Sequence, residues 1–193
     1  MRPALVLAAL LALAAPAAHA QTHVGLGVRV GAGDPTSSFS NTLYLPTAIS
    51  FSVPIDLAGV VRIEPSAGLA SVSSEGEDAE FSERQRTVGL SVSALVPAPD
   101  VTLTAGARVR YADFRQTYVG VQEEPYESDV VAVGPLVGGE YALSSRFSVG
   151  AEVGLEYRRY TVRNSFSFDG TTTETDASGV GTTAGVVVRF FLF

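Results

Sequence analysis

The sequence predicts an all-β protein: an eight-stranded antiparallel up-and-down transmembrane β-barrel, preceded by a cleavable signal peptide. Three observations carry this prediction. Apolar and polar residues alternate with a period of two in eight segments of the chain. The links between these segments are alternately short and long. The first twenty residues have the composition of an export signal.

The N-terminal segment is typical of a secretory signal peptide. Arg2 gives a short positive region, residues 5–15 form an unbroken apolar run, and Ala18-His19-Ala20 is a small-x-small cleavage site. A helix of that run would be about 17 Å long, shorter than a bilayer core of about 30 Å. We therefore expect cleavage after Ala20, giving a signal peptide over residues 1–20 and a barrel domain over residues 21–193. The alternative is an uncleaved N-terminal anchor.

The segment 147–158 shows the alternation most clearly. Its odd positions, from Phe147 to Tyr157, are apolar, whereas its even positions are Ser, Gly, Glu or Arg. Successive side chains of a strand point to opposite faces, so the two sets occupy different environments. The same pattern predicts further strands, each long enough to cross a bilayer when tilted, in residues 24–31, 45–53, 61–69, 88–94, 101–111, 131–143 and 184–192.

The links between the expected strands indicate a direction across the membrane. Residues 54–59, 97–100 and 144–146 form three short links, and the links that alternate with them are longer and polar. Barrels of the bacterial outer membrane have short periplasmic turns and long external loops. An even number of strands also brings both termini to the side of the short turns. We therefore expect an outer-membrane barrel with both termini in the periplasm.

Two kinds of barrel fit eight alternating strands: a soluble lipocalin-type barrel with an apolar interior, and a membrane barrel with an apolar exterior. The polar faces are rich in Gly, Ser and Thr, whereas a surface facing water carries about 25–35% charged residues. Aromatic residues stand near the strand ends, as in the girdles at two membrane interfaces. These residues are Tyr111 and Tyr157 at the long-link end, and Phe147, Tyr141 and Phe190 at the short-link end. Both observations favour the membrane barrel.

The composition excludes several classes of partner and chemistry. The chain has 13 basic and 20 acidic residues, a formal net charge of −7, and every basic residue is Arg. A nucleic acid or a docking face for anionic lipid would require a basic surface. The absence of cysteine excludes disulfide and thiolate chemistry.

The C-terminal residues carry a family resemblance. Phe190-Phe191-Leu192-Phe193 places a terminal Phe at the end of an alternating strand. With its eight strands, the mature chain resembles small outer-membrane barrels of the OmpA-transmembrane-domain or OmpX type, grouped as an outer membrane protein β-barrel domain. The resemblance implies that Phe193 serves as a signal for the outer-membrane assembly machinery and that the barrel has no wide pore. Arg189 departs from the usual signal, which has an apolar residue at that position.

Charged residues of the expected membrane segments fall on the inward face. Because buried charges need partners, six Arg and four Glu in a narrow barrel predict a polar plug. The alternative is a gated path for small ions or protons. The ten residues of this predicted interior charge network are Arg29, Arg62, Glu64, Arg108, Arg110, Glu140, Glu152, Glu156, Arg158 and Arg189.

The long links are acidic, with clusters in residues 75–83, 123–129 and 169–176. Their spacing lacks the pattern of a calcium-binding loop, so we predict a solvated surface and no metal site, with divalent cation capture as the alternative. Phe114, Tyr118, Tyr126, Tyr160, Phe166 and Phe168 near the links are expected to extend the outer girdle or pack at the loop bases.

Catalysis has little support in the sequence. Of the two histidines, His19 leaves with the signal peptide and His23 lies at the expected periplasmic rim. Small outer-membrane lipid A enzymes use a His with a Ser near the outer leaflet, and that pair cannot form in this topology. We predict a non-enzymatic, cofactor-free, monomeric barrel with a structural, envelope-integrity or surface-interaction role, in contact with outer-membrane lipid and lipopolysaccharide. The alternatives are a narrow channel for small solutes or ions and, less favoured, a lipid-modifying enzyme.

Overall fold

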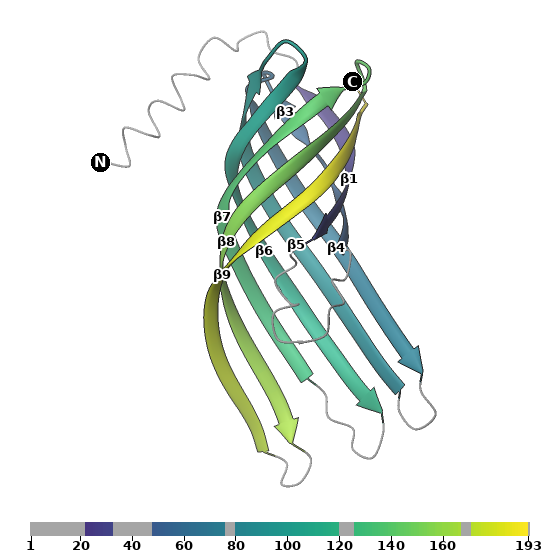
Figure 1. Cartoon of the computed structure of the whole chain (residues 1–193), viewed down its shortest axis with the longest axis vertical. Coiled ribbons are helices and arrows are strands. Elements are labelled where there is room, and N and C mark those ends of the chain that lie inside the picture. The colour runs from purple at the N-terminus through teal and green to yellow at the C-terminus, as the bar shows by residue number, and fades with distance from the viewer. Residues whose placement is uncertain (1–21, 33–47, 76–79, 120–125, 167–170, 193) are drawn as a thin grey trace, which may run out of the picture.

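In a computed structural model, the described residues are 22–32, 48–75, 80–119, 126–166 and 171–192. They form a single antiparallel sheet whose first and last strands pair, which closes it into a ring (Figure 1). No helix among these residues is long and apolar enough to span a membrane. The strands are β1 (His23–Ala32), β2 (Ala48–Ser52), β3 (Ile55–Leu57), β4 (Val61–Glu75), β5 (Glu80–Pro97), β6 (Val101–Val119), β7 (Tyr126–Ala142), β8 (Phe147–Phe166) and β9 (Thr171–Phe191).

The strands β2 and β3 occupy one position in the ring. Both pair with β1 on one side and with β4 on the other. Pro54 interrupts the strand because it has no N–H to donate, but its carbonyl accepts a 2.9 Å hydrogen bond from the N–H of Gly25. The ring therefore has eight strand positions, which confirms the predicted eight-stranded up-and-down barrel.

The three short links are tight turns at one end of the barrel. The chain reverses at Ala58 and Gly59, both with positive φ (61° and 64°), and the N–H of Val60 donates to the carbonyl of Leu57 at 3.1 Å. This left-handed pair is the geometry that two-residue hairpin turns favour. The other short links are residues 98–100 and 143–146, within two residues of the predicted positions. The C-terminal end of the chain lies at this same end of the barrel (Figure 1).

Three of the four long links differ from the sequence expectation, because most of their described residues are strand, and the first long link, residues 33–44, lies outside the described residues. β8 and β9 stay paired as far as Phe166 and Thr171, and β5 and β6 as far as Glu80 and Val119. Long hairpins therefore project beyond the closed part of the ring at the end opposite the short turns (Figure 1). The loops among the described residues are therefore shorter than the sequence predicts. The reason is that alternation of apolar residues, which marks a strand at membrane level, stops where the strand enters water.

The described side chains confirm the inside-out arrangement of a membrane barrel. Large apolar side chains stand on the outer surface, and Leu69 (73% exposed), Phe51 (64%) and Leu26 (58%) are examples. Arg62 and Glu64 are buried, with 4% exposed each. A soluble barrel would show the reverse. The predicted girdle residues Tyr111, Tyr157, Phe147, Tyr141 and Phe190 all have exposed side chains.

Toward the hairpin end, several of the inward-facing side chains are apolar instead of charged. A small apolar cluster of Ala112, Val130, Tyr160 and Val162 is buried there, with Ala177 packed against it. Phe114 is also buried. Of the two alternatives expected for Phe114 and Tyr160, packing at the bases of the hairpins agrees with the structure and extension of the outer girdle does not, because both side chains are buried. Tyr118, Tyr126, Phe166 and Phe168 belong to segments whose side chains lie outside the described residues.

Candidate functional site

The barrel interior holds a network of ion pairs that divides into two clusters along the strands. The turn-side cluster, whose members lie within about five residues of the short-turn ends of their strands, consists of Asp56, Arg62, Glu64, Glu140, Glu152 and Arg189. The hairpin-side cluster, farther along the strands, consists of Arg29, Arg108, Arg110, Glu156 and Arg158.

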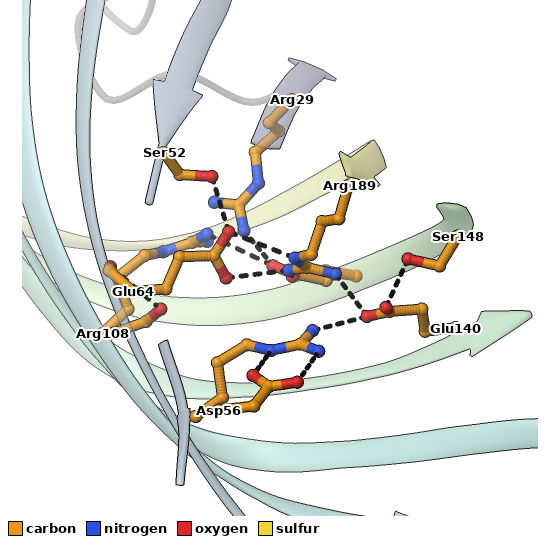
Figure 2. A network of polar contacts seen from close by, with 11 residues as sticks. Arg29, Ser52, Asp56, Glu64, Arg108, Glu140, Ser148 and Arg189 are labelled. Atoms are coloured by element: carbon orange, nitrogen blue, oxygen red, sulfur yellow. Dashed lines mark hydrogen bonds and ion pairs between the residues drawn. The ribbon is translucent and has the colours of Figure 1, made fainter. Parts of the chain in front are cut away.

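Arg189 of β9 is the centre of the turn-side cluster (Figure 2). Its two terminal nitrogens contact Glu64 at 2.8 Å, Glu140 at 2.6 Å and Glu152 at 2.7 Å. These carboxylates come from β4, β7 and β8, so one guanidinium joins four strands. Only 3% of the Arg189 side chain is exposed. In so buried a place, charge-assisted hydrogen bonds are much stronger than on a surface.

Arg62 of β4 extends the turn-side cluster across the bore. Its guanidinium binds both carboxylate oxygens of Asp56, at 2.6 and 2.8 Å, and donates to Glu140 of β7 at 2.5 Å. β5 and β6 separate β4 from β7 in the ring. The contact between Arg62 and Glu140 therefore spans the interior.

Hydroxyl groups complete the turn-side cluster. Ser52 donates to Glu64 at 2.6 Å, and Ser148 donates to Glu140 at 2.5 Å (Figure 2). Among the described residues, no buried side-chain nitrogen or oxygen of this cluster lacks a hydrogen-bond partner. Because the loss of one partner from a fully hydrogen-bonded buried ion pair leaves an uncompensated charge, we expect substitutions in this cluster to destabilise the barrel more than substitutions elsewhere in the interior.

The hairpin-side cluster is less well paired. Arg110 binds Glu156 at 2.6 Å, whereas Arg108 lies 3.4 Å from Glu156 and 3.7 Å from Glu152. Within the described part of the chain, the one hydrogen bond of the Arg108 side chain goes to the Thr183 hydroxyl, at 3.0 Å. Arg29 reaches Glu152 and so connects the two clusters. This cluster has four arginines and one carboxylate, while two arginines face four carboxylates on the turn side. Among the described residues, the interior therefore carries an excess of negative charge on the turn side and of positive charge on the hairpin side.

All ten residues of the predicted interior charge network face the interior, and the structure brings each into at least one ion pair with another. Sequence reasoning missed Asp56, Ser52, Ser148 and Thr183, which also belong to the network. Asp56 stands directly opposite Arg62 in the β3–β4 pairing. Continuing the alternation of residues 45–53 past Pro54 would have placed it inside.

A second set of charges lies on the outer surface of the hairpins, beyond the girdle residues Tyr111 and Tyr157. Arg163 contacts Asp129 at 2.9 Å and Glu174 at 3.3 Å, and Arg159 contacts Asp176 at 3.0 Å. The hydrogen bond from Arg159 lowers the pKa of the Asp176 carboxyl. Asp129, Glu174 and Asp176, which the sequence analysis assigns to acidic loops, therefore lie on strands and form ion pairs with arginine. No group of three or more potential metal ligands occurs among the described residues. Phe193 and the acidic residues at 76–79, 120–125 and 167–170 lie outside them.

The fold and the inverted burial define a transmembrane β-barrel of a bacterial outer membrane. The sequence profile of the outer membrane protein beta-barrel domain matches residues 5–190, so the chain belongs to this family.

Solved outer-membrane proteins share the fold. A major outer membrane protein from Thermus thermophilus superposes with a TM-score of 0.55 at 14% identity, covering 88% of this chain and 99% of that chain. Neisserial surface protein A gives 0.51 at 15% identity, with coverage of 88% and 96%. Ail of Yersinia pestis, in complex with the heparin analogue sucrose octasulfate, gives 0.51 at 13% identity, with coverage of 88% and 97%. At these identities the likeness concerns the fold. No curated protein sequence matches this chain.

Proposed function

We propose that this protein is a non-enzymatic outer-membrane barrel with a structural, envelope-integrity or surface-interaction role, and that the interior charge network plugs its bore. The observation that carries the proposal is the pair of contacts that cross the interior, Arg62 to Glu140 and Arg189 to Glu64. Eight strands leave an interior that side chains can fill. Charged groups held in this way close the bore at membrane level.

The position of the histidine supports a non-enzymatic role. Within the described part of the chain, the one histidine is His23, at the short-turn end, where its ring stands 6.4 Å from that of Phe191. A general base there is remote from the external leaflet and from the hairpins. In this proposal the protein works as a monomer after insertion by the outer-membrane assembly machinery, and its outer surface contacts lipid and lipopolysaccharide.

A narrow channel is the second candidate function. It is favoured by a cavity of about 50 Å³ among Arg29, Arg108 and Arg110, which shows that the hairpin side of the interior is not completely filled. Conduction would require ions to pass the turn-side cluster, whose centre is filled by hydrogen-bonded side chains.

Planar-bilayer recording separates the two functions. We expect the purified wild-type protein to show no steady conductance, and the double variant Arg62→Ala/Arg189→Ala to open the bore and conduct. Arg84→Ala/Arg86→Ala, which removes two exposed arginines from β5 on the outer surface, is the matched control and should stay closed. Steady wild-type openings that disappear on substitution of Arg108 or Glu152 would establish the channel instead.

A further inference from the structure

The cavity on the hairpin side of the interior has the composition of an anion site. Its charged lining consists of Arg29, Arg108, Arg110 and Glu152, which gives three guanidinium groups to one carboxylate. Hydroxyl and amide groups surround them, from Ser50, Ser66, Gln85, Thr87 and Thr183. The lining reaches Ile49 and Leu69, near the point where β2 begins. The cavity therefore extends to the rim of the closed ring, on the side of the hairpins.

The three arginines of the lining keep buried donors that nothing in the described part of the chain accepts. The Nε atoms of Arg29, Arg108 and Arg110 are inaccessible to solvent and make no hydrogen bond there. The side chain of Arg108 is only 6% exposed. Its contacts with Glu152 and Glu156 are long, so its charge is weakly compensated. A buried cation that lacks close partners is costly, and a bound anion removes that cost.

We propose that this cavity binds a small tetrahedral oxyanion of the phosphate or sulfate type. Guanidinium groups hold such oxyanions through paired N–H donors, and the neighbouring hydroxyls can donate to the remaining oxygens. A volume of about 50 Å³ holds about three or four water molecules, or one oxyanion of five heavy atoms. Neutral water would satisfy hydrogen bonds but would leave the excess positive charge in place.

The proposal stands independently of the structural role. An oxyanion bound beside Glu152 would leave the turn-side cluster closed, and a silent barrel can still hold an anion. Failure of one proposal therefore leaves the other intact: conductance tests the plug, and anion binding tests the cavity.

Calorimetric titration of the folded barrel with inorganic phosphate tests the site, in maltoside micelles that contain no phosphate and at constant ionic strength maintained with chloride. We expect saturable binding with about one phosphate per chain, and at least about tenfold weaker binding in Arg108→Gln, which loses a charged donor. Arg84→Gln removes an equal charge from the outer surface of β5 and should bind as the wild type does.

A second variant tests the site without removing an arginine. Thr87 lines the cavity, and Thr87→Glu would supply a tethered carboxylate to the same guanidinium groups. We expect this variant to unfold at a higher temperature and to lose phosphate binding, because the introduced carboxylate occupies the anion's place. Phosphate binding that survives in Thr87→Glu, or no saturable phosphate binding in the wild type, would overturn the proposal. Displacement of phosphate by micellar phosphatidic acid would assign the site to a lipid headgroup and overturn the assignment to a free oxyanion.

Discussion

The turn-side and hairpin-side clusters of the barrel interior both consist of arginine and carboxylate residues, but they differ in how completely these charges are hydrogen-bonded. On the turn side, Glu64 and Glu140 each accept hydrogen bonds from arginine and from serine, at 2.5–3.2 Å. On the hairpin side, the closest contacts of Arg108 with carboxylates of the described residues are 3.4 and 3.7 Å, and the buried Nε atoms of Arg29 and Arg108 make no hydrogen bond to any of these residues. Counting charged residues in a barrel therefore does not reveal whether they brace it. The number of hydrogen bonds that each buried charge makes decides this.

The largest effect is expected from removing the central arginine of the turn-side cluster. Arg189→Gln leaves Glu64, Glu140 and Glu152 buried with fewer donors, and should lower the free energy of unfolding by about 3–5 kcal/mol. The measurement is urea unfolding of the barrel in lipid vesicles. Arg146→Gln, in an exposed turn, makes the same change of charge and should leave the free energy nearly unaltered. A cost below about 1 kcal/mol for Arg189→Gln would show that this cluster does not brace the barrel.

The corresponding change on the hairpin side is expected to cost little. Arg108→Met removes a buried charge whose carboxylate contacts are long and replaces it with an apolar side chain of similar length. The substitution leaves neither carboxylate without an arginine, because Glu156 keeps its 2.6 Å contact with Arg110 and Glu152 keeps its 2.7 Å contact with Arg189. Measured by the same unfolding method without phosphate, the change should lie within about 1 kcal/mol of zero. A loss as large as that of Arg189→Gln would remove the distinction between the two clusters.

The exposed ion pairs of the hairpins allow the buried charge clusters to be compared with paired charges that are in contact with water. Asp176 accepts hydrogen bonds from Arg159 and Thr161, and its pKa lies below the ordinary value of 3.8. Arg159→Gln should raise that pKa toward 3.8, as followed by carbon NMR of the carboxyl group during acid titration. Because the folded-state pKa is lowered, the stabilisation by this pair is complete above about pH 4 and is lost as the pH falls through the folded-state value. An unchanged pKa in Arg159→Gln would show that the pair does not persist in solution.

The membrane-spanning part of the fold could be predicted from the sequence because alternation there reflects one contrast, between side chains that face lipid and side chains that face the interior. In 147–158, every apolar residue faces lipid and every polar one faces the interior, so the inward charges could be named. Beyond Tyr111 and Tyr157 both faces of the hairpins carry mixed residues, and the prediction mistook these strands for loops. Asp56 was missed for a related reason, since Pro54 was taken to end the strand.

The pairing of the interior charges could not be predicted from the sequence. Arg189 is 125 residues from Glu64 and 49 from Glu140, and their contacts depend on the register of every intervening strand and on closure between β1 and β9. The cavity likewise depends on how the side chains of several strands fill one space. Alternation identifies the inward charges, but the geometry of the closed ring divides them into the turn-side and the hairpin-side cluster.

The coupling energy between Arg189 and Glu140 shows whether the turn-side cluster stabilises the barrel as one unit. A double-mutant cycle of Arg189→Gln, Glu140→Gln and their combination, measured by unfolding in lipid vesicles, isolates the interaction of the pair from the separate effects of each substitution. We predict a favourable coupling of about 1–3 kcal/mol, because the 2.6 Å contact is buried and belongs to a fully hydrogen-bonded cluster. A coupling below about 0.5 kcal/mol would contradict it, since the two residues would then act as independent buried charges.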